Sequence, residues 1–153
     1  MFSSFLLKGA LAALTVLEIG ATSADDINNY PIFADAMTAE GSNFGWKSYP
    51  LTSGNGYNLI MFRVTEDATG TPLTPTKGPI LLVHGMFSSP TDFLGRSDSG
   101  SASLPIQLAQ MGYDVWIGCS RGRPYTDTHT VYDLNNPDEE KSYWDYTYEE
   151  IGK

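Results

Sequence analysis

A short apolar run ends in a sharp turn within residues 79–94, which read PILLVHGMFSSPTDFL. The four apolar residues at 80–83 do not alternate with polar ones, which predicts a strand covered on both faces of a parallel sheet. Gly85 follows His84 and lets the backbone turn, and the Ser-Ser-Pro-Thr sequence at 88–91 cannot continue the strand. The chain is therefore expected to leave a buried strand at the carboxyl edge of the sheet, where open α/β sheets bind ligands.

The residues after this turn predict a helix and a second strand. The helix covers residues 104–111, with Ser103 or Ser101 as its cap and Gly112 as the residue that closes it. Residues 113–117, Tyr-Asp-Val-Trp-Ile, then form an apolar strand. A strand, a helix and a strand in this order make a βαβ unit, whose two strands run parallel.

The residues before the turn predict a short helix and a hairpin. Apolar residues recur along one helical face over residues 30–40. Residues 46–51 and 57–64 read as two strands around Asn55-Gly56, a pair that favours the primed turns with positive φ at both central residues. We therefore expect an antiparallel pair at the edge of a mixed sheet, followed by a loop over residues 66–78.

The composition describes an acidic globular chain of 153 residues, 41% hydrophobic and 12% aromatic. The net charge of −9 argues against a nucleic-acid partner, because phosphates require a basic face. The single cysteine, Cys119, excludes an intrachain disulfide. No His, Cys or Asp cluster has ligand spacing, so we predict no metal and no organic cofactor. Five carboxylates near the carboxyl end lack the spacing of a calcium loop and are interpreted as a solvated acidic face: Asp133, Asp138, Glu139, Glu140 and Asp145.

Residues 1–24 have the pattern of a secretory signal peptide. Lys8 supplies a positive charge, residues 9–17 form an apolar run too short to span a bilayer, and small residues at 21–24 precede two aspartates. A buried helix of the fold is disfavoured, because the polar residues at 25–29 break the pattern. We therefore expect residues 25–153 to form a mature protein that is secreted or lysosomal.

The sequence Gly-Cys-Ser-Arg-Gly at residues 118–122 satisfies the Gly-x-Ser-x-Gly pattern of hydrolase nucleophiles. That pattern marks a nucleophile only where a helix begins directly after the serine, and residues 123–130 have no apolar helical period. We therefore predict that Ser120 is not a nucleophile. His129 could serve Ser120 as a base but is expected to be a surface residue.

The role of Cys119 can be interpreted in two ways. Arg121 and Arg123 lie close to it in the sequence and could lower the pKa of its thiol. Because Cys119 follows an apolar strand, we interpret it instead as a small buried residue.

Residues 113–122 resemble the corresponding segment of the acid lipases, the family of gastric and lysosomal acid lipases. The Asn-Gly-Tyr hairpin at 55–57, the His-Gly turn with the bulky Met86, and the aromatic run at 143–151 fall in the same order as in that family. The resemblance covers residues 30–153. It implies an incomplete α/β-hydrolase fold, a mixed sheet with an antiparallel hairpin followed by a parallel βαβ unit.

The resemblance also implies a function for the full-length protein. It would be a secreted or lysosomal lipase or esterase that hydrolyses acyl esters, glycerides or sterol esters, through a serine acyl-enzyme at a lipid–water interface. This chain would be its amino-terminal part, inactive alone, ending before the nucleophile and lacking the acid and the base. The Met86 backbone N–H would be an oxyanion donor, with His84 and Gly85 supporting the turn.

Two alternatives remain open at this point. One is an α/β-hydrolase of other specificity, such as a peptidase or an epoxide hydrolase. The other is a non-catalytic lipid-binding pseudo-enzyme.

The signal peptide gives a first prediction. Amino-terminal sequencing of the secreted protein is expected to find Ala24 or Asp25 as the first residue, because the small residues before them form the cleavage site. Secreted protein that begins with Met1 would contradict it.

Overall fold

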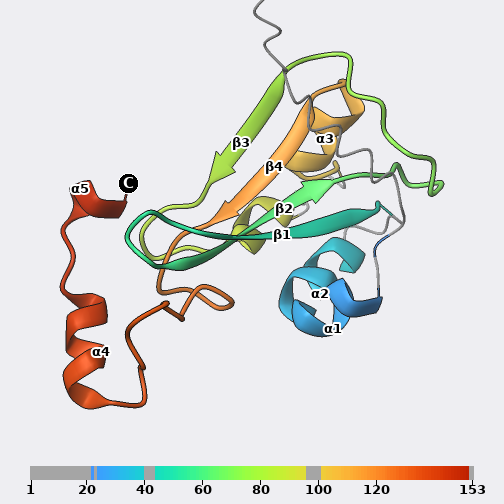
Figure 1. Cartoon of the computed structure of the whole chain (residues 1–153). Coiled ribbons are helices and arrows are strands. Elements are labelled where there is room, and N and C mark those ends of the chain that lie inside the picture. The colour runs from blue at the N-terminus through green and yellow to red at the C-terminus, as the bar shows by residue number, and fades with distance from the viewer. Residues whose placement is uncertain (1–21, 23, 40–43, 96–100, 152–153) are drawn as a thin grey trace, which may run out of the picture.

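A four-stranded mixed sheet in the order β1-β2-β4-β3 forms the centre of the computed structural model, which describes residues 22, 24–39, 44–95 and 101–151 (Figure 1). The strands are β1 (Trp46–Thr52), β2 (Asn58–Val64), β3 (Pro79–Val83) and β4 (Asp114–Cys119). β2 is antiparallel to both β1 and β4, whereas β3 and β4 are parallel. The α/β class, the edge hairpin and the parallel βαβ unit are thus confirmed.

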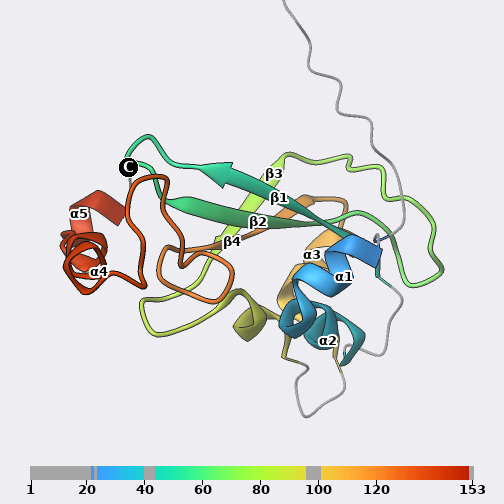
Figure 2. The ribbon, with the colours of Figure 1, turned by 60° about the horizontal axis from the view of Figure 1, so that its bottom comes forward.

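Three helices cover one face of the sheet, as Figure 2 shows: α1 (Ala24–Asn29), α2 (Pro31–Ala39) and α3 (Leu104–Gln110). A 3-10 helix, η1 (Pro90–Leu94), packs against α2, α3 and β4. Two further helices, α4 (Pro137–Trp144) and α5 (Tyr148–Ile151), lie beyond the end toward which β3 and β4 run. No helix of the described part of the chain is long and apolar enough to cross a membrane.

The core fills the space between the sheet and the helices on this face. Successive strand residues point to opposite faces, so every second residue of β2 and β4 is buried there. The Phe33 ring of α2 stacks on Phe62 of β2, with 3.8 Å between the ring centroids. Ile106 of α3 is buried in the same cluster. The predicted helices over 30–40 and 104–111 are therefore confirmed as core-facing helices.

The β3 strand differs from the prediction that both of its faces are covered. Its burial alternates, and Leu81 and Val83 are 56% and 58% exposed. Among the described strands β3 pairs with β4 alone, and the helices α1 to α3 pack on the opposite face of the sheet. The apolar run of β3 therefore has cover on one face only within this part of the chain.

The polar residues 25–29, for which the sequence predicted no helix, form most of α1, a helix without buried residues. Two carboxylates in its first turn suit the positive end of the helix dipole. A contact distant in sequence also holds the segment, since Asp26 Oδ1 accepts from the Ser48 amide of β1 at 3.1 Å. Of the predicted signal peptide only Thr22 and Ala24 are described, and Thr22 Oγ1 accepts from the Trp46 amide at 2.9 Å.

The spacing of Trp144, Tyr148 and Ile151 in the sequence predicts one helix that begins at Trp144, and the structure differs from this prediction. In the structure Trp144 ends α4, and α5 begins separately at Tyr148. Asn136 caps α4 by accepting from the Asp138 amide, and Pro137 occupies its first turn, as helix starts favour. The acidic residues interpreted as a solvated face are exposed or half-exposed, and three of them form the first turn of α4.

The hairpin turn has one left-handed residue rather than the two predicted. Gly56 has a φ of 93°, and its amide donates to the Ser53 carbonyl at 3.0 Å, whereas Asn55 is not left-handed. A Cβ at Gly56 would lie 2.6 Å from Thr130 Oγ1, but at Gly54 it would have no neighbour within 4 Å. A type I turn followed by a left-handed glycine fits the twist of a hairpin as a primed turn does.

These two glycines make a matched test of the turn. Gly56→Ala is expected to lower the free energy of unfolding by about 2 kcal/mol, because alanine resists the left-handed region and has no space there. Gly54→Ala is the control and should change stability by less than about 0.5 kcal/mol. Chemical denaturation of both variants measures the difference, and equal stabilities would refute this account of the turn.

Candidate functional site

Two turns meet where the parallel strands β3 and β4 end. Val83 of β3 lies opposite Gly118 of β4, so the residues after them emerge at the same edge of the sheet. His84, which is buried, follows β3, and Ser120 follows β4. The Ser120 amide donates to His84 Nε2 at 3.0 Å, which joins the two turns directly.

This hydrogen bond fixes the proton on the His84 ring. A backbone N–H can only donate, so Nε2 must be the unprotonated, accepting nitrogen. The proton of the neutral ring is therefore on Nδ1, which lies 2.9 Å from the Gly85 carbonyl oxygen. That oxygen also accepts from the Ser88 amide at 3.1 Å. Both lone pairs of the Gly85 carbonyl are thus engaged on the side of His84 and Ser88.

The Met86 amide belongs to the same peptide plane as the Gly85 carbonyl. In a trans peptide the C=O and the N–H point in opposite directions, so the Met86 N–H points away from the donors that hold Gly85. Within the described ranges the Met86 amide has no hydrogen-bond acceptor. The structure thus brings Met86, His84 and Gly85 together as one turn with a free backbone donor.

The far side of this turn is held by the start of η1. The Ser88 hydroxyl donates to Asp92, and this hydrogen bond keeps the pKa of the Asp92 carboxyl below its usual range. The turn therefore has anchors on both sides.

A cavity of about 380 Å³ opens between the two turns and the end of the chain that is described. Its walls combine apolar side chains with a few polar groups, as ligand sites commonly do. Met86 and Phe87 at its rim are 58% and 91% exposed. The lining comes from residues 83–87, from residues 120–123, and from Trp144, Tyr146 and Ile151.

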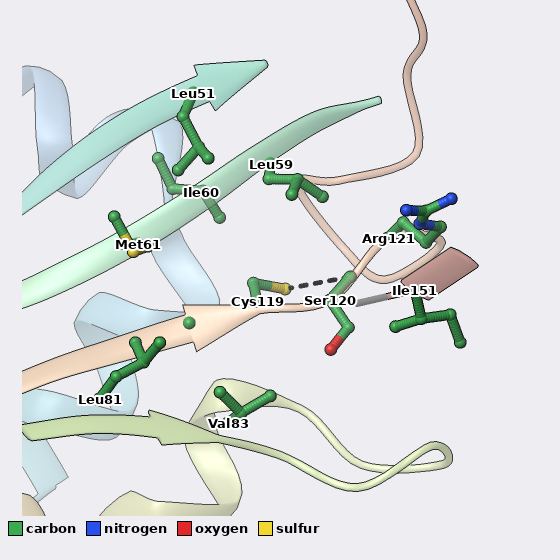
Figure 3. Close-up of a pocket in the computed structure, with 11 residues that line it drawn as sticks. Leu51, Leu59, Ile60, Met61, Leu81, Val83, Cys119, Ser120, Arg121 and Ile151 are labelled. Atoms are coloured by element: carbon green, nitrogen blue, oxygen red, sulfur yellow. Dashed lines mark hydrogen bonds between the residues drawn. The ribbon is translucent and has the colours of Figure 1, made fainter. Parts of the chain in front are cut away.

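A second cavity, of about 230 Å³, lies on the face of the sheet that the helices α1 to α3 leave open (Figure 3). Both cavities are lined by Val83, Ser120, Arg121 and Ile151, so the two adjoin. Most of the remaining lining is apolar and comes from the strands: Leu51, Leu59, Ile60, Met61 and Leu81. The surface next to the turns is therefore apolar.

Ser120 lacks the setting of a nucleophile. A turn follows it instead of a helix, as the sequence predicted. His84 Nε2 is occupied by the Ser120 backbone amide, and within the described residues the Ser120 hydroxyl has no hydrogen-bond partner. Figure 3 shows this hydroxyl pointing toward β3. Among the described residues no base is placed to take the proton of this hydroxyl, and the lack of a nucleophilic role for Ser120 stays a prediction.

His129 lies away from Ser120, against the hairpin. Its Nδ1 accepts from the Val131 amide at 3.0 Å, so its proton is on Nε2, 2.8 Å from the Asn55 carbonyl oxygen. It is half-buried rather than a free surface residue, because it stacks on Tyr132.

Arg121 is a residue of the site whose role the sequence did not indicate. It is 5% exposed, and its guanidinium lies 3.9 Å from the centroid of the Tyr57 ring and 5.0 Å from that of Tyr146. Its Nη2 donates to the Glu150 carbonyl at 2.6 Å. Arg121 therefore ties α5, and with it one wall of the larger cavity, to the hairpin. Sequence alone offered no sign of this, since its three contacts come from distant segments.

Cys119 is buried, as predicted, and the reading of it as a reactive thiolate is wrong. Burial raises the pKa of the Cys119 thiol to about 11, despite the opposing effects of Thr126 and Arg123. Its Sγ lies 3.7 Å from Thr126 Oγ1. Within the described residues no group of three or more His, Cys, Asp or Glu side chains could hold a metal ion.

The known proteins to which this chain is similar carry lipase names. The chain is 36% identical over 113 residues to Lipase 1 of Drosophila melanogaster, which is 72% of this chain and 23% of that protein. It is 32% identical over 114 residues to the tear acid lipase-like protein of Mesocricetus auratus and 27% identical over 114 residues to the gastric triacylglycerol lipase of Bos taurus. Each of these two matches covers 73% of this chain and 27% of the relative. No family model matches the chain.

These relatives, together with the mixed sheet and the turns at its carboxyl edge, relate the chain to the lipases. Within that class it belongs to the acid lipase family, as the sequence motifs predicted. The chain spans about a quarter of the length of the curated relatives it matches.

Burial of Cys119 has a measurable consequence. A thiol whose pKa is raised from 9.0 to about 11 holds about 100-fold less thiolate at neutral pH, and the thiolate is the form that reacts. Native protein should therefore react with iodoacetamide at least about 100-fold more slowly than protein unfolded in guanidinium chloride. Mass spectrometry of the labelled protein gives both rates, and equal rates would refute this description of Cys119.

Proposed function

We propose that this chain is the amino-terminal part of an α/β-hydrolase lipase domain that is secreted or lysosomal. The complete domain would hydrolyse acyl esters, glycerides or sterol esters, through a serine acyl-enzyme at a lipid–water interface. The support is membership of the acid lipase family and the position of the two turns at the carboxyl edge of the sheet. The lipase names of the relatives favour esters over the substrates of a peptidase or an epoxide hydrolase.

Within that domain the Met86 backbone N–H binds the oxygen that becomes negative in the transition state. The observation that carries this proposal is the orientation of the Gly85–Met86 peptide, whose carbonyl is engaged by two donors and whose N–H has no acceptor in the described residues. A donor held in advance is what an oxyanion site requires, because no reorganisation is needed when charge develops.

The remaining catalytic groups come from outside this chain. The setting of Ser120 argues against an elbow, and neither His84 nor His129 has a free nitrogen directed at a serine hydroxyl. A serine hydrolase needs a nucleophile, a base and an orienting acid. The chain alone is therefore inactive, and its contribution is one oxyanion donor and one apolar wall.

Met86 tests the proposal in a complete enzyme that carries residues 25–153. Met86→Pro removes the N–H and should lower kcat by about 10²–10³-fold, the usual loss for one oxyanion donor. Met86→Leu keeps the N–H and nearly the same volume and should be close to neutral. A thermal melt of each variant separates lost chemistry from lost structure.

Ser120→Ala in the same enzyme is the control for the nucleophile. It should keep most of the activity, whereas loss of a true nucleophile costs on the order of 10⁶ in turnover. A folded and fully active Met86→Pro enzyme would exclude the oxyanion role. If the complete wild-type protein has no esterase activity, the non-catalytic lipid-binding alternative is favoured.

A further inference from the structure

The Gly-x-Ser-x-Gly motif at residues 118–122 has no role in the chemistry proposed above. We propose that this motif positions the turn formed by His84, Gly85 and Met86, called the oxyanion turn below. Thr126 is the residue that holds the motif in place. A chain of hydrogen bonds runs from the Thr126 hydroxyl through the Ser120 backbone and the His84 ring to the Gly85 carbonyl. Its consequence for catalysis rests on the function proposed for Met86, whereas the chain of hydrogen bonds itself can be tested separately.

The first step is the bond between Thr126 and Ser120. Thr126 is fully buried, and its hydroxyl lies 2.6 Å from the Ser120 carbonyl oxygen. The hydroxyl has one proton and a second acceptor, the Arg123 carbonyl, at 3.0 Å. The contact with the Ser120 carbonyl is the shorter of the two, so it takes the proton. The Arg123 amide donates to the same hydroxyl oxygen at 3.1 Å, and Cys119 Sγ lies 3.7 Å from it.

Thr126 is itself held rigidly. Its carbonyl accepts from the Gly122 amide at 2.9 Å and from the Tyr143 hydroxyl at 2.9 Å. Tyr143 is fully buried, and its hydroxyl oxygen accepts in turn from the Gly122 amide at 3.1 Å. The loop after β4 is therefore closed on itself around Thr126, and Ser120 is fixed at its start.

The second step transfers this position to the oxyanion turn. With its carbonyl held by Thr126, Ser120 directs its amide to His84 Nε2, 3.0 Å away. This amide selects the His84 tautomer with the proton on Nδ1, and that proton fixes the Gly85 carbonyl. Because the Met86 N–H lies in the same peptide plane, its direction is set as well. With the proton on Nε2 instead, the ring would lose both bonds at once.

The chain contains an internal reference for this tautomer. It has two histidines, and the contacts of His129 require the opposite form, with the proton on Nε2. His129 lies against the hairpin at Asn55 and does not take part in the positioning bonds. One measurement can therefore observe both forms side by side in the same sample.

Nitrogen-15 NMR of the two imidazoles in the chain tests the proposal. In the wild-type protein, His84 should have a protonated Nδ1 and an unprotonated Nε2, and His129 the reverse. His84 protonated on Nε2 would overturn the proposal without any variant.

A pair of substitutions then tests Thr126. Thr126→Val removes the hydroxyl and keeps the shape, so the Ser120 amide should exchange with solvent on the order of tenfold faster, and His84 should become a mixture of tautomers. Thr126→Ser keeps the hydroxyl and should retain the wild-type spectrum, and His129 should not change in either variant. If the Ser120 amide and the His84 tautomer in Thr126→Val match the wild type, Thr126 has no positioning role.

The catalytic consequence has its own readout in the complete enzyme. Thr126→Val should lower kcat by about tenfold with little change in KM, and Thr126→Ser should restore it, because only the direction of a transition-state donor is affected. A changed tautomer with unchanged kcat would overturn the catalytic consequence and count against Met86 as the oxyanion donor. It would leave the hydrogen-bonded positioning of the turn in place.

Discussion

The parallel pairing of β3 with β4 is the constraint on which the site depends. Because the two strands run in the same direction with Val83 opposite Gly118, both chains turn at the same edge of the sheet. The buried His84 ring then spans the two turns with one hydrogen bond to each of their backbones. A buried ring with both nitrogens satisfied avoids the cost of an unpaired polar group and holds the turns at a fixed separation.

The opposite wall of the larger cavity depends on a different kind of contact. Arg121 is packed between the Tyr57 and Tyr146 rings and donates to the carbonyl of Glu150. Tyr57 adds a hydrogen bond from its hydroxyl to the Tyr143 carbonyl at 2.6 Å. The hairpin, the loop after β4 and the last two helices are thereby joined through aromatic rings and one guanidinium. A guanidinium suits this position because it is weakly hydrated and is attracted to aromatic faces.

Local sequence patterns were enough for most of the fold. Apolar periodicity located α2 and α3, and the alternation of strand and helix gave the parallel pair. The helices α1 and α4 were not predicted, because neither has an apolar face of regular period. α1 has no buried residue and is anchored by Asp26 to β1, and α4 buries Tyr143 alone. A cap at Asn136 with Pro137 after it was the signal available for α4.

By itself the sequence determined the strands, the βαβ unit and the family, because each depends on residues within one short segment or on their order. It also supplied the prediction that Ser120 is not a nucleophile, from the absence of an apolar helical period at residues 123–130. The tertiary structure alone decided which face of β3 is covered, since burial depends on what packs above a strand. It alone decided the proton position on His84, which a backbone amide 36 residues away selects. It also decided the burial of Arg121, whose aromatic partners lie on separate elements. Such properties arise from pairs of groups that meet only when the chain is folded.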